Sequence, residues 1–234
     1  MMRMALGFAG AWLLLAPTAA EAIVQDVFPL GGNAVPPGAQ RYAQNATVRT
    51  APPTAARKPP QVQELPKVYL LRGFLNVFSL GMDDLATKLQ ANGIFAMVTN
   101  HADADLITSR IVTDYNAGDR SPIVLVGHSL GADAIVDVAD ALGRYNIPVT
   151  LMVLFDGTEP HQIPANVLSA INYTKHFTIA PAPGSRGTAT NVDFSTDASI
   201  DHLSIDTAPA LQSQTLNAVL QIASTPARPP GPRR

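Results

Sequence analysis

A serine lies between two glycines in the motif Gly-His-Ser-Leu-Gly at residues 127–131. An apolar, strand-like run at 123–126 precedes the motif, and a run with helical spacing follows it from Leu130. When a strand turns sharply into a helix, the serine at the turn is strained and backbone approaches backbone, which glycine at the flanking positions tolerates. The hydroxyl is then exposed above the sheet. The motif therefore predicts that Ser129 is a nucleophile.

The elements that must position Ser129 alternate between short apolar runs and longer amphipathic ones. The short runs at 123–126 and 149–155 are almost continuously apolar, which is typical of strands buried on both faces of a parallel sheet. We expect strands at 67–72, 94–99, 123–126, 149–155 and 176–180, and helices at 82–92, 105–116, 130–142 and 208–223. The pattern predicts an α/β domain over residues 67–223, a three-layer α/β/α sandwich with a mostly parallel central sheet.

The strand, the Gly-His-Ser-Leu-Gly turn and the following Gly-Ala-Asp-Ala helix start resemble the α/β-hydrolase superfamily, specifically its lipase and thioesterase-like branches. The resemblance covers about two thirds of the chain, from Lys67 to the closing helix. It implies a compact α/β-hydrolase fold and a catalytic triad in the chain order serine, acid, histidine. The implied reaction is hydrolysis of a small-molecule carboxylic ester or thioester through an acyl-enzyme on Ser129.

The histidines that follow Ser129 are His161, His176 and His202. His176 falls inside an expected strand, and His161 lies in a proline-flanked loop with an ordinary surface explanation. His202 lies in a loop just ahead of the last helix, where the resemblance implies the catalytic histidine. We therefore predict that His202 is the general base that takes the proton of Ser129.

The acid of the triad has more than one candidate in the sequence. Asp156 follows the strand at 149–155, and catalytic groups gather at the carboxyl ends of parallel strands. Asp193 and Asp197 are later candidates in a polar segment expected to be loop, whereas Asp201 is too close in sequence to His202. We favour Asp156 as the residue that orients the base, with Asp193 as the alternative.

An acyl-enzyme mechanism also needs two donors for the oxyanion. The backbone N–H of Leu130, the residue after the nucleophile, is the first candidate. The second should come from the loop after the first strand, where related lipases have a His-Gly pair. Here Arg72 replaces the histidine and Gly73 is kept, so the N–H of Phe74 is the predicted donor.

The segments outside 67–223 have other compositions. Residues 1–22 combine Arg3, an apolar run at 5–16 and a small-residue stretch, which indicates a cleaved signal peptide and a periplasmic or secreted protein. The apolar run is shorter than the roughly 20 residues of a membrane span, so we expect no stable span after cleavage. Residues 23–66 form a Pro/Ala-rich arm or linker, and 224–234 a disordered tail.

Composition excludes several function classes. The net charge is −2, which gives no broad positive field for nucleic acid. The absence of cysteine excludes a thiol nucleophile and disulfides. His101, Asp103 and Asp105 share no recognised ligand spacing, so we expect no metal and no cofactor. Two alternatives stay open: a non-catalytic binding protein with an α/β-hydrolase fold, and an acyltransferase that uses the same triad.

Overall fold

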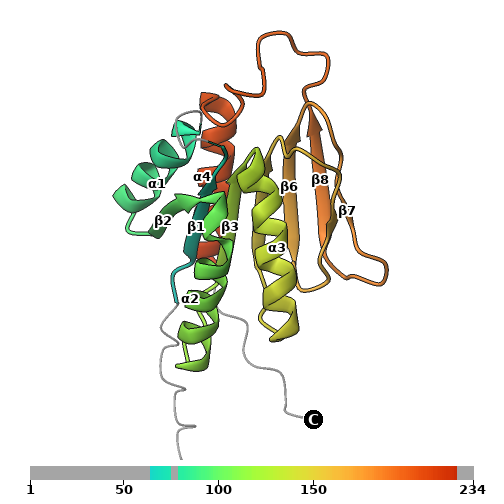
Figure 1. Ribbon diagram of the computed structural model, residues 1–234. Coiled ribbons are helices and arrows are strands. Elements are labelled where there is room, and N and C mark those ends of the chain that lie inside the picture. Colours follow the sequence, from blue (N-terminus) through green and yellow to red (C-terminus); the bar gives the residue numbers. More distant parts are fainter. Residues whose placement is uncertain (1–63, 75–78, 226–234) are drawn as a thin grey trace, which may run out of the picture. The chain divides into compact units, whose positions relative to one another are not determined.

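A single six-stranded parallel sheet is the centre of the domain (Figure 1). The computed structural model describes residues 64–74 and 79–225. Its sheet has the order β2-β1-β3-β4-β6-β8, and every neighbouring pair is parallel. The strands are β1 (Lys67–Arg72), β2 (Phe95–Asn100), β3 (Ile123–His128), β4 (Leu151–Phe155), β6 (Ser169–Thr174) and β8 (Thr188–Asp193). Two short strands, β5 (Gln162–Ile163) and β7 (Ala180–Pro181), pair apart from it.

Helices cover both faces of this sheet (Figure 1). On one face lie α1 (Leu80–Ala91) and α4 (Pro209–Ser224), and on the other α2 (Ala104–Asn116) and α3 (Leu130–Arg144). A 3-10 turn, η2 (His101–Asp103), leads from β2 into α2. The predicted three-layer α/β/α sandwich is therefore confirmed.

The alternation of side chains along β1 explains why the sheet needs helices on both sides. Val68 and Leu70 are fully buried in the core beneath α1 and α4. Tyr69 and Leu71 point the other way, into the core beneath α2 and α3. Because both sets are apolar, each face of the strand gains stability by being covered.

The last strands of the sheet differ from the expectation. The prediction of a strand at 176–180 was wrong, because the strand lies earlier, at β6. The chain near Ile179 is a loop, and the amide oxygen of Asn191 accepts a hydrogen bond from the Ile179 N–H at 2.8 Å. The segment expected as loop around Asp193 instead contains β8. This edge strand is mostly exposed and lacks the continuous apolar run of a central strand, because neither face is fully covered.

The predicted terminal segments are largely outside this structure. The signal peptide (1–22), the arm up to residue 63 and residues 226–234 of the tail lie outside the described residues. Within the described ranges, no helix combines the length and apolar character that a membrane crossing requires.

Candidate active site

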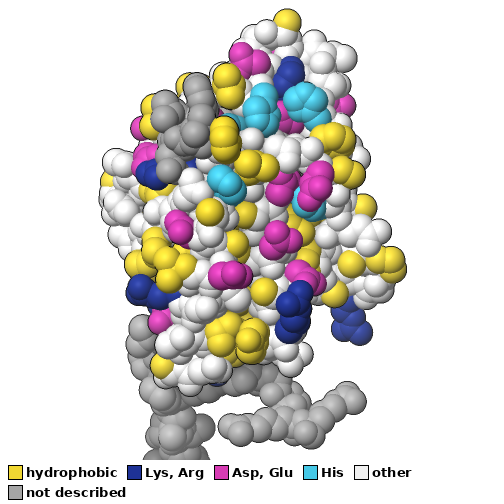
Figure 2. Space-filling view, in the orientation of Figure 1, with side chains coloured by type: hydrophobic (Ala, Val, Ile, Leu, Met, Phe, Trp, Pro, Cys, Tyr) yellow, Lys and Arg dark blue, Asp and Glu magenta, His cyan; other side chains and the backbone are white. Residues whose placement is uncertain are grey.

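Ser129, His202 and Asp156 come together at the carboxyl edge of the sheet. The Ser129 Oγ is 3.0 Å from His202 Nε2, and His202 Nδ1 is 2.8 Å from Asp156 Oδ2. Ser129 follows β3, Asp156 follows β4, and His202 lies in the loop between β8 and α4. Figure 2 shows histidine side chains gathered toward one end of this face, with hydrophobic and acidic side chains among them. The three side chains form a hydrogen-bonded line from hydroxyl to carboxylate.

The serine has a strained backbone at the junction of β3 and α3. Its φ is 55° and its ψ is −128°, in a region that non-glycine residues rarely adopt. The Ser129 N–H donates to the Phe155 carbonyl oxygen at 3.0 Å, which anchors the turn to the end of the neighbouring strand. Asp156, the next residue, also has a positive φ, 47°. Both turns direct their side chains to the same edge of the sheet.

The two glycines of the motif are required by close backbone approach. A Cβ on Gly127 would lie 2.2 Å from the Gly131 carbonyl oxygen, and one on Gly131 would lie 2.0 Å from the Leu71 carbonyl oxygen. These distances are far below van der Waals contact, so a side chain at either position would displace the turn. A strained serine between two such glycines, after a central parallel strand, has the geometry of a nucleophile elbow. The parallel sheet between two helical layers, together with this turn, resembles the fold of the α/β-hydrolases.

Comparison with solved structures returns proteins of low identity. A Xanthomonas campestris protein described as a hydrolase of the alpha/beta superfamily is 18% identical over 67% of this chain and 98% of its own, with a TM-score of 0.39. A cutinase-like protein from Cryptococcus is 16% identical over 70% and 98%, with a TM-score of 0.45. An acetyl xylan esterase is 14% identical over 69% and 100%, with a TM-score of 0.41. Neither a protein-family model nor a curated protein matches the chain.

Within the hydrolase fold, Asp156 is a fully buried carboxylate that remains ionised. Burial alone would raise its pKa, but the hydrogen bonds from His202 and from the Lys175 N–H, together with the charge of the neighbouring histidines, outweigh burial and lower the pKa to about 2. The carboxylate therefore stays negative throughout the neutral range, where it can orient an imidazole and stabilise an imidazolium.

The Asp156 carboxylate also changes the pKa of His202. The hydrogen bond to Asp156 raises the pKa of His202 above the ordinary 6.5, against burial, which lowers it. A base with a raised pKa accepts the serine proton more readily, but a larger fraction of it is already protonated at neutral pH. Activity that depends on the neutral imidazole should therefore rise with pH through a value above 6.5.

The alternative acids, Asp193 and Asp197, and the histidine His161 form hydrogen bonds with other residues. The Asp193 carboxylate accepts from the Ser195 N–H at 2.7 Å, and that of Asp197 accepts from the Ser199 N–H at 2.8 Å. His161 bonds through Nε2 to Asp133 at 2.8 Å. Among these candidates, only Asp156 is placed to orient His202.

His176 is a neighbour of the site that sequence reasoning missed. Its Nδ1 is 2.9 Å from Asp156 Oδ2 and 3.1 Å from Oδ1. The expected strand at 176–180 concealed this contact, because a strand interior would direct His176 to a sheet face. The actual strand β6 ends at Thr174, so His176 follows it at the carboxyl edge, beside β4, which Asp156 follows.

The predicted oxyanion donors belong to Leu130, which follows Ser129 in the chain, and to Phe74, which follows Gly73. Leu130 is the first residue of α3, so its N–H has no acceptor within the helix. A Cβ on Gly73 would lie 2.9 Å from Ser129 Cβ, so Gly73, at the start of the loop after β1, lies directly against Ser129, with Phe74 next in the chain. Arg72 bonds through Nε to Asp83 of α1 at 2.8 Å. The residues from 75 to 78 lie outside the described residues.

A buried chain of hydrogen bonds joins the Gly73 loop to the His202 loop through His128. The Gly73 N–H donates to Ser79 Oγ at 2.9 Å, and Ser79 Oγ is 2.8 Å from His128 Nδ1. His128 Nε2 is 2.8 Å from the His202 carbonyl oxygen. Since that carbonyl can only accept, His128 donates from Nε2 and accepts the Ser79 hydroxyl at Nδ1. Burial lowers the pKa of His128 to about 4, which keeps the ring in the neutral form that this chain requires.

Asp206 is a buried carboxyl next to this chain. Its Oδ2 accepts from the Gly81 N–H at 3.1 Å and lies 3.7 Å from His128 Nδ1, while its Oδ1 is buried without a hydrogen-bond partner among the described residues. Burial raises the pKa of Asp206 to about 7. The folded protein therefore favours the neutral acid at this position.

We expect Asp206→Asn to stabilise the protein increasingly as pH rises. Between pH 4 and 7 the unfolded carboxyl is ionised and the folded one is protonated, so the contribution of Asp206 to stability falls as pH rises through that window. The amide does not titrate. The difference between the free energies of unfolding of the variant and the wild type should therefore grow, in favour of the variant, by up to about 1.4 kcal/mol per pH unit. Urea denaturation of both proteins from pH 5 to 8 measures this difference. A difference that does not change with pH would contradict the raised pKa.

His101 lies at the same edge of the sheet, in η2 after β2. Its Nδ1 is buried and has no hydrogen-bond partner among the described residues. The Asp103 carboxylate accepts instead from the Thr99 hydroxyl at 2.7 Å and the Asn100 N–H at 3.1 Å. These contacts close the turn into α2 and give Asp103 a local structural role.

Proposed function

We propose that the protein is an exported serine hydrolase that cleaves a carboxylic ester or thioester through an acyl-enzyme on Ser129. The observation that carries the proposal is the line from Ser129 Oγ to His202 Nε2 at 3.0 Å and from His202 Nδ1 to Asp156 at 2.8 Å, within a nucleophile elbow. A serine is a weak nucleophile unless a neighbouring base takes its proton, and this line supplies the base and the group that orients it.

The proposed reaction proceeds in two halves. His202 Nε2 takes the Ser129 proton while Oγ bonds to the substrate carbonyl carbon, and the oxyanion accepts from the N–H groups of Leu130 and Phe74. When the tetrahedral intermediate collapses, the bond to the alcohol or thiol breaks, and His202 returns the proton to that leaving group. Water then attacks the acyl-enzyme, with His202 again as base, and releases the acid and the free serine.

Apolar side chains adjacent in sequence to the site favour an acyl substrate. Phe74 follows Gly73 and is 61% exposed, and Leu203 follows His202 and is 55% exposed. Leu80, at the start of α1 after Ser79, is 58% exposed. Exposed large apolar side chains that adjoin a catalytic constellation provide contact area for the hydrocarbon part of a substrate.

Labelling with a fluorophosphonate probe tests the nucleophile. The wild-type protein should be labelled, and Ser129→Ala should not, because the probe reacts with a serine that a base activates. Ser121→Ala, at a serine outside the site, is the matched control and should be labelled like the wild type. Equal labelling of the wild type and Ser129→Ala, or labelling of neither, would show that the nucleophile assignment is wrong.

Export is the part of the proposal that depends on residues 1–22 alone. A positive start, an apolar run and small residues support cleavage after about residue 22. Mass spectrometry of the protein recovered from the periplasm or the medium of a bacterial expression host should give a mature chain that lacks these residues. Recovery of only the full-length chain, inside the cell, would contradict export.

A further inference from the structure

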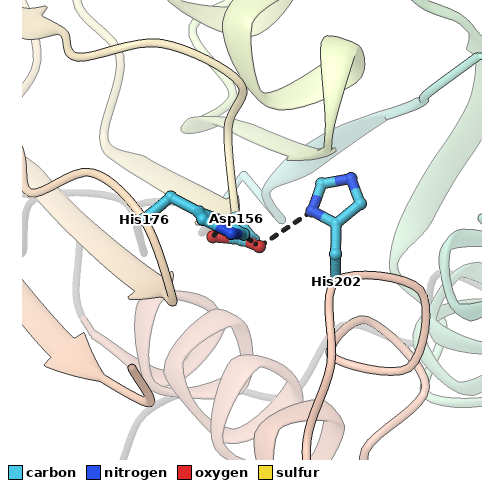
Figure 3. A group of neighbouring side chains, drawn as sticks. All are labelled: Asp156, His176 and His202. Carbon is cyan, nitrogen blue, oxygen red and sulfur yellow. Dashed lines mark hydrogen bonds and ion pairs between the residues drawn. The ribbon is translucent and has the colours of Figure 1, made fainter. Parts of the chain in front are cut away.

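Asp156 contacts two histidines, although the proposed mechanism uses one. His202 Nδ1 and His176 Nδ1 lie 2.8 Å and 2.9 Å from the same carboxylate oxygen, Oδ2 (Figure 3). One ligand atom from each of the three side chains lies within 4.8 Å of the others. His176 takes no part in the proposed acyl transfer, so its contact with the carboxylate must have another explanation.

We propose that Asp156, His176 and His202 bind a zinc-like divalent transition-metal ion, and that this ion inhibits the active site. The inhibitory part rests on the proposed hydrolase function, whereas the binding part does not. Two imidazole nitrogens and one carboxylate oxygen form a donor set that suits Zn²⁺, Cu²⁺ or Ni²⁺, whereas Mg²⁺ and Ca²⁺ prefer oxygen ligands. Three protein ligands also leave a position for water.

The three ligand atoms would have to shift from their present positions to admit the ion. Zinc bonds to imidazole and carboxylate are about 2.0–2.2 Å, so tetrahedral ligands lie about 3.3 Å apart. The present separations from Asp156 Oδ2 are 2.8 Å and 2.9 Å, so each of these two pairs would open by roughly half an ångström, while the two Nδ1 atoms, now within 4.8 Å of each other, would come to about 3.3 Å. The His176 side chain is 54% exposed, which gives it room to adjust and gives an ion access from solvent.

The carboxylate is already oriented for this role. Asp156 Oδ1 accepts from the Lys175 N–H at 2.8 Å, which leaves Oδ2 toward the two histidines. Outer hydrogen bonds of this kind fix metal ligands and raise their affinity. The Lys175 ammonium bonds to the carbonyl oxygens of Phe194 and Asp197, at 2.9 Å and 2.8 Å, so it is held by the β8–α4 loop.

Binding would inhibit the site by changing the tautomer of His202. In the structure the Nδ1 atoms donate to Asp156, because a carboxylate can only accept. A metal takes the Nδ1 lone pair, so each neutral ring transfers its proton to Nε2 through solvent, with no net release of protons. His202 Nε2–H would then face Ser129 Oγ and could no longer accept its proton. The ion therefore prevents His202 from acting as a base without itself binding to Ser129.

Metal binding can be measured without catalysis, in the Ser129→Ala protein. Untagged Ser129→Ala should bind one Co²⁺ at this site with visible d–d absorption that Zn²⁺ displaces. Adding His176→Gln should raise the Kd at least tenfold. The matched control is His161→Gln, which removes a histidine bonded to a different carboxylate, that of Asp133, and should leave the Kd unchanged. Equal affinity with and without His176, or dependence on His161 instead, would overturn the proposed site.

Inhibition is measured separately on proteins with Ser129 intact. Micromolar Zn²⁺ should suppress hydrolysis of an activated ester, and EDTA should restore it. Each variant is compared with its own metal-free rate, and His176→Gln should need at least tenfold more Zn²⁺ for half-inhibition. Unchanged sensitivity in His176→Gln would overturn the inhibitory role. If Co²⁺ binding depends on His176 but no variant hydrolyses any ester, the metal site is supported and the proposed function is the part that fails.

Discussion

His202→Ala is expected to lower kcat/KM for an activated ester by about 10⁶-fold. Loss of the general base alone costs about as much as loss of a whole serine triad, because the remaining members cannot act without it. The expected size follows from the 3.0 Å contact between His202 Nε2 and Ser129 Oγ, through which the proton must pass. Steady-state hydrolysis of p-nitrophenyl acetate, with protein folding checked by circular dichroism, measures the change.

The control for this prediction is a second histidine bonded to a carboxylate. His161→Ala removes the histidine bonded to Asp133 of α3, which is not part of the hydrogen-bonded line from Ser129 to Asp156, and should change kcat/KM by less than tenfold. A His202→Ala protein that is folded and retains more than a hundredth of wild-type turnover would show that His202 is not the base.

Asp156→Asn is expected to lower kcat/KM about 10⁴-fold, because the amide no longer selects the productive tautomer of His202 or stabilises its charged form. It should also move the acid limb of the pH profile. The carboxylate raises the pKa of His202, so its removal lowers that pKa and lets the residual activity persist to lower pH. Measurement of kcat/KM from pH 5 to 9 for the variant and the wild type separates the two effects.

Asp193→Asn is the matched control for the acid, since Asp193 was the alternative in the sequence. Its carboxylate is exposed at the end of β8 and accepts from Ser195, so the change should leave kcat/KM within a few-fold and the acid limb in place. A larger loss for Asp193→Asn than for Asp156→Asn would reverse the assignment.

The parts of the fold that were predicted from sequence are those with strong local signals. The strand at 123–128 is buried at every position, and the glycines at 127 and 131 fix the turn around Ser129. The amphipathic helices α1 to α4 were predicted to within a few residues, because their apolar spacing reflects which face each one buries.

The parts that were not predicted depend on contacts far apart in the chain. β8 is an exposed edge strand, so nothing in its local composition separates it from loop. His176 meets Asp156 only because β6 and β4 are neighbours in the sheet, and an error of a few residues in the strand position hid that contact. Ser79 and His128 are 49 residues apart, and their hydrogen bond follows from where α1 starts relative to β3.

The hydrogen bonds from Gly73 through Ser79 and His128 to His202 also have a consequence for local unfolding. They join a loop near the start of the domain to one near its end, with no water-exposed group in between. Segments tied in this way open cooperatively in native-state amide exchange. The Gly73 amide and the amides around His202 should therefore share one opening free energy, so that the Gly73 loop and the His202 loop are ordered together or lost together.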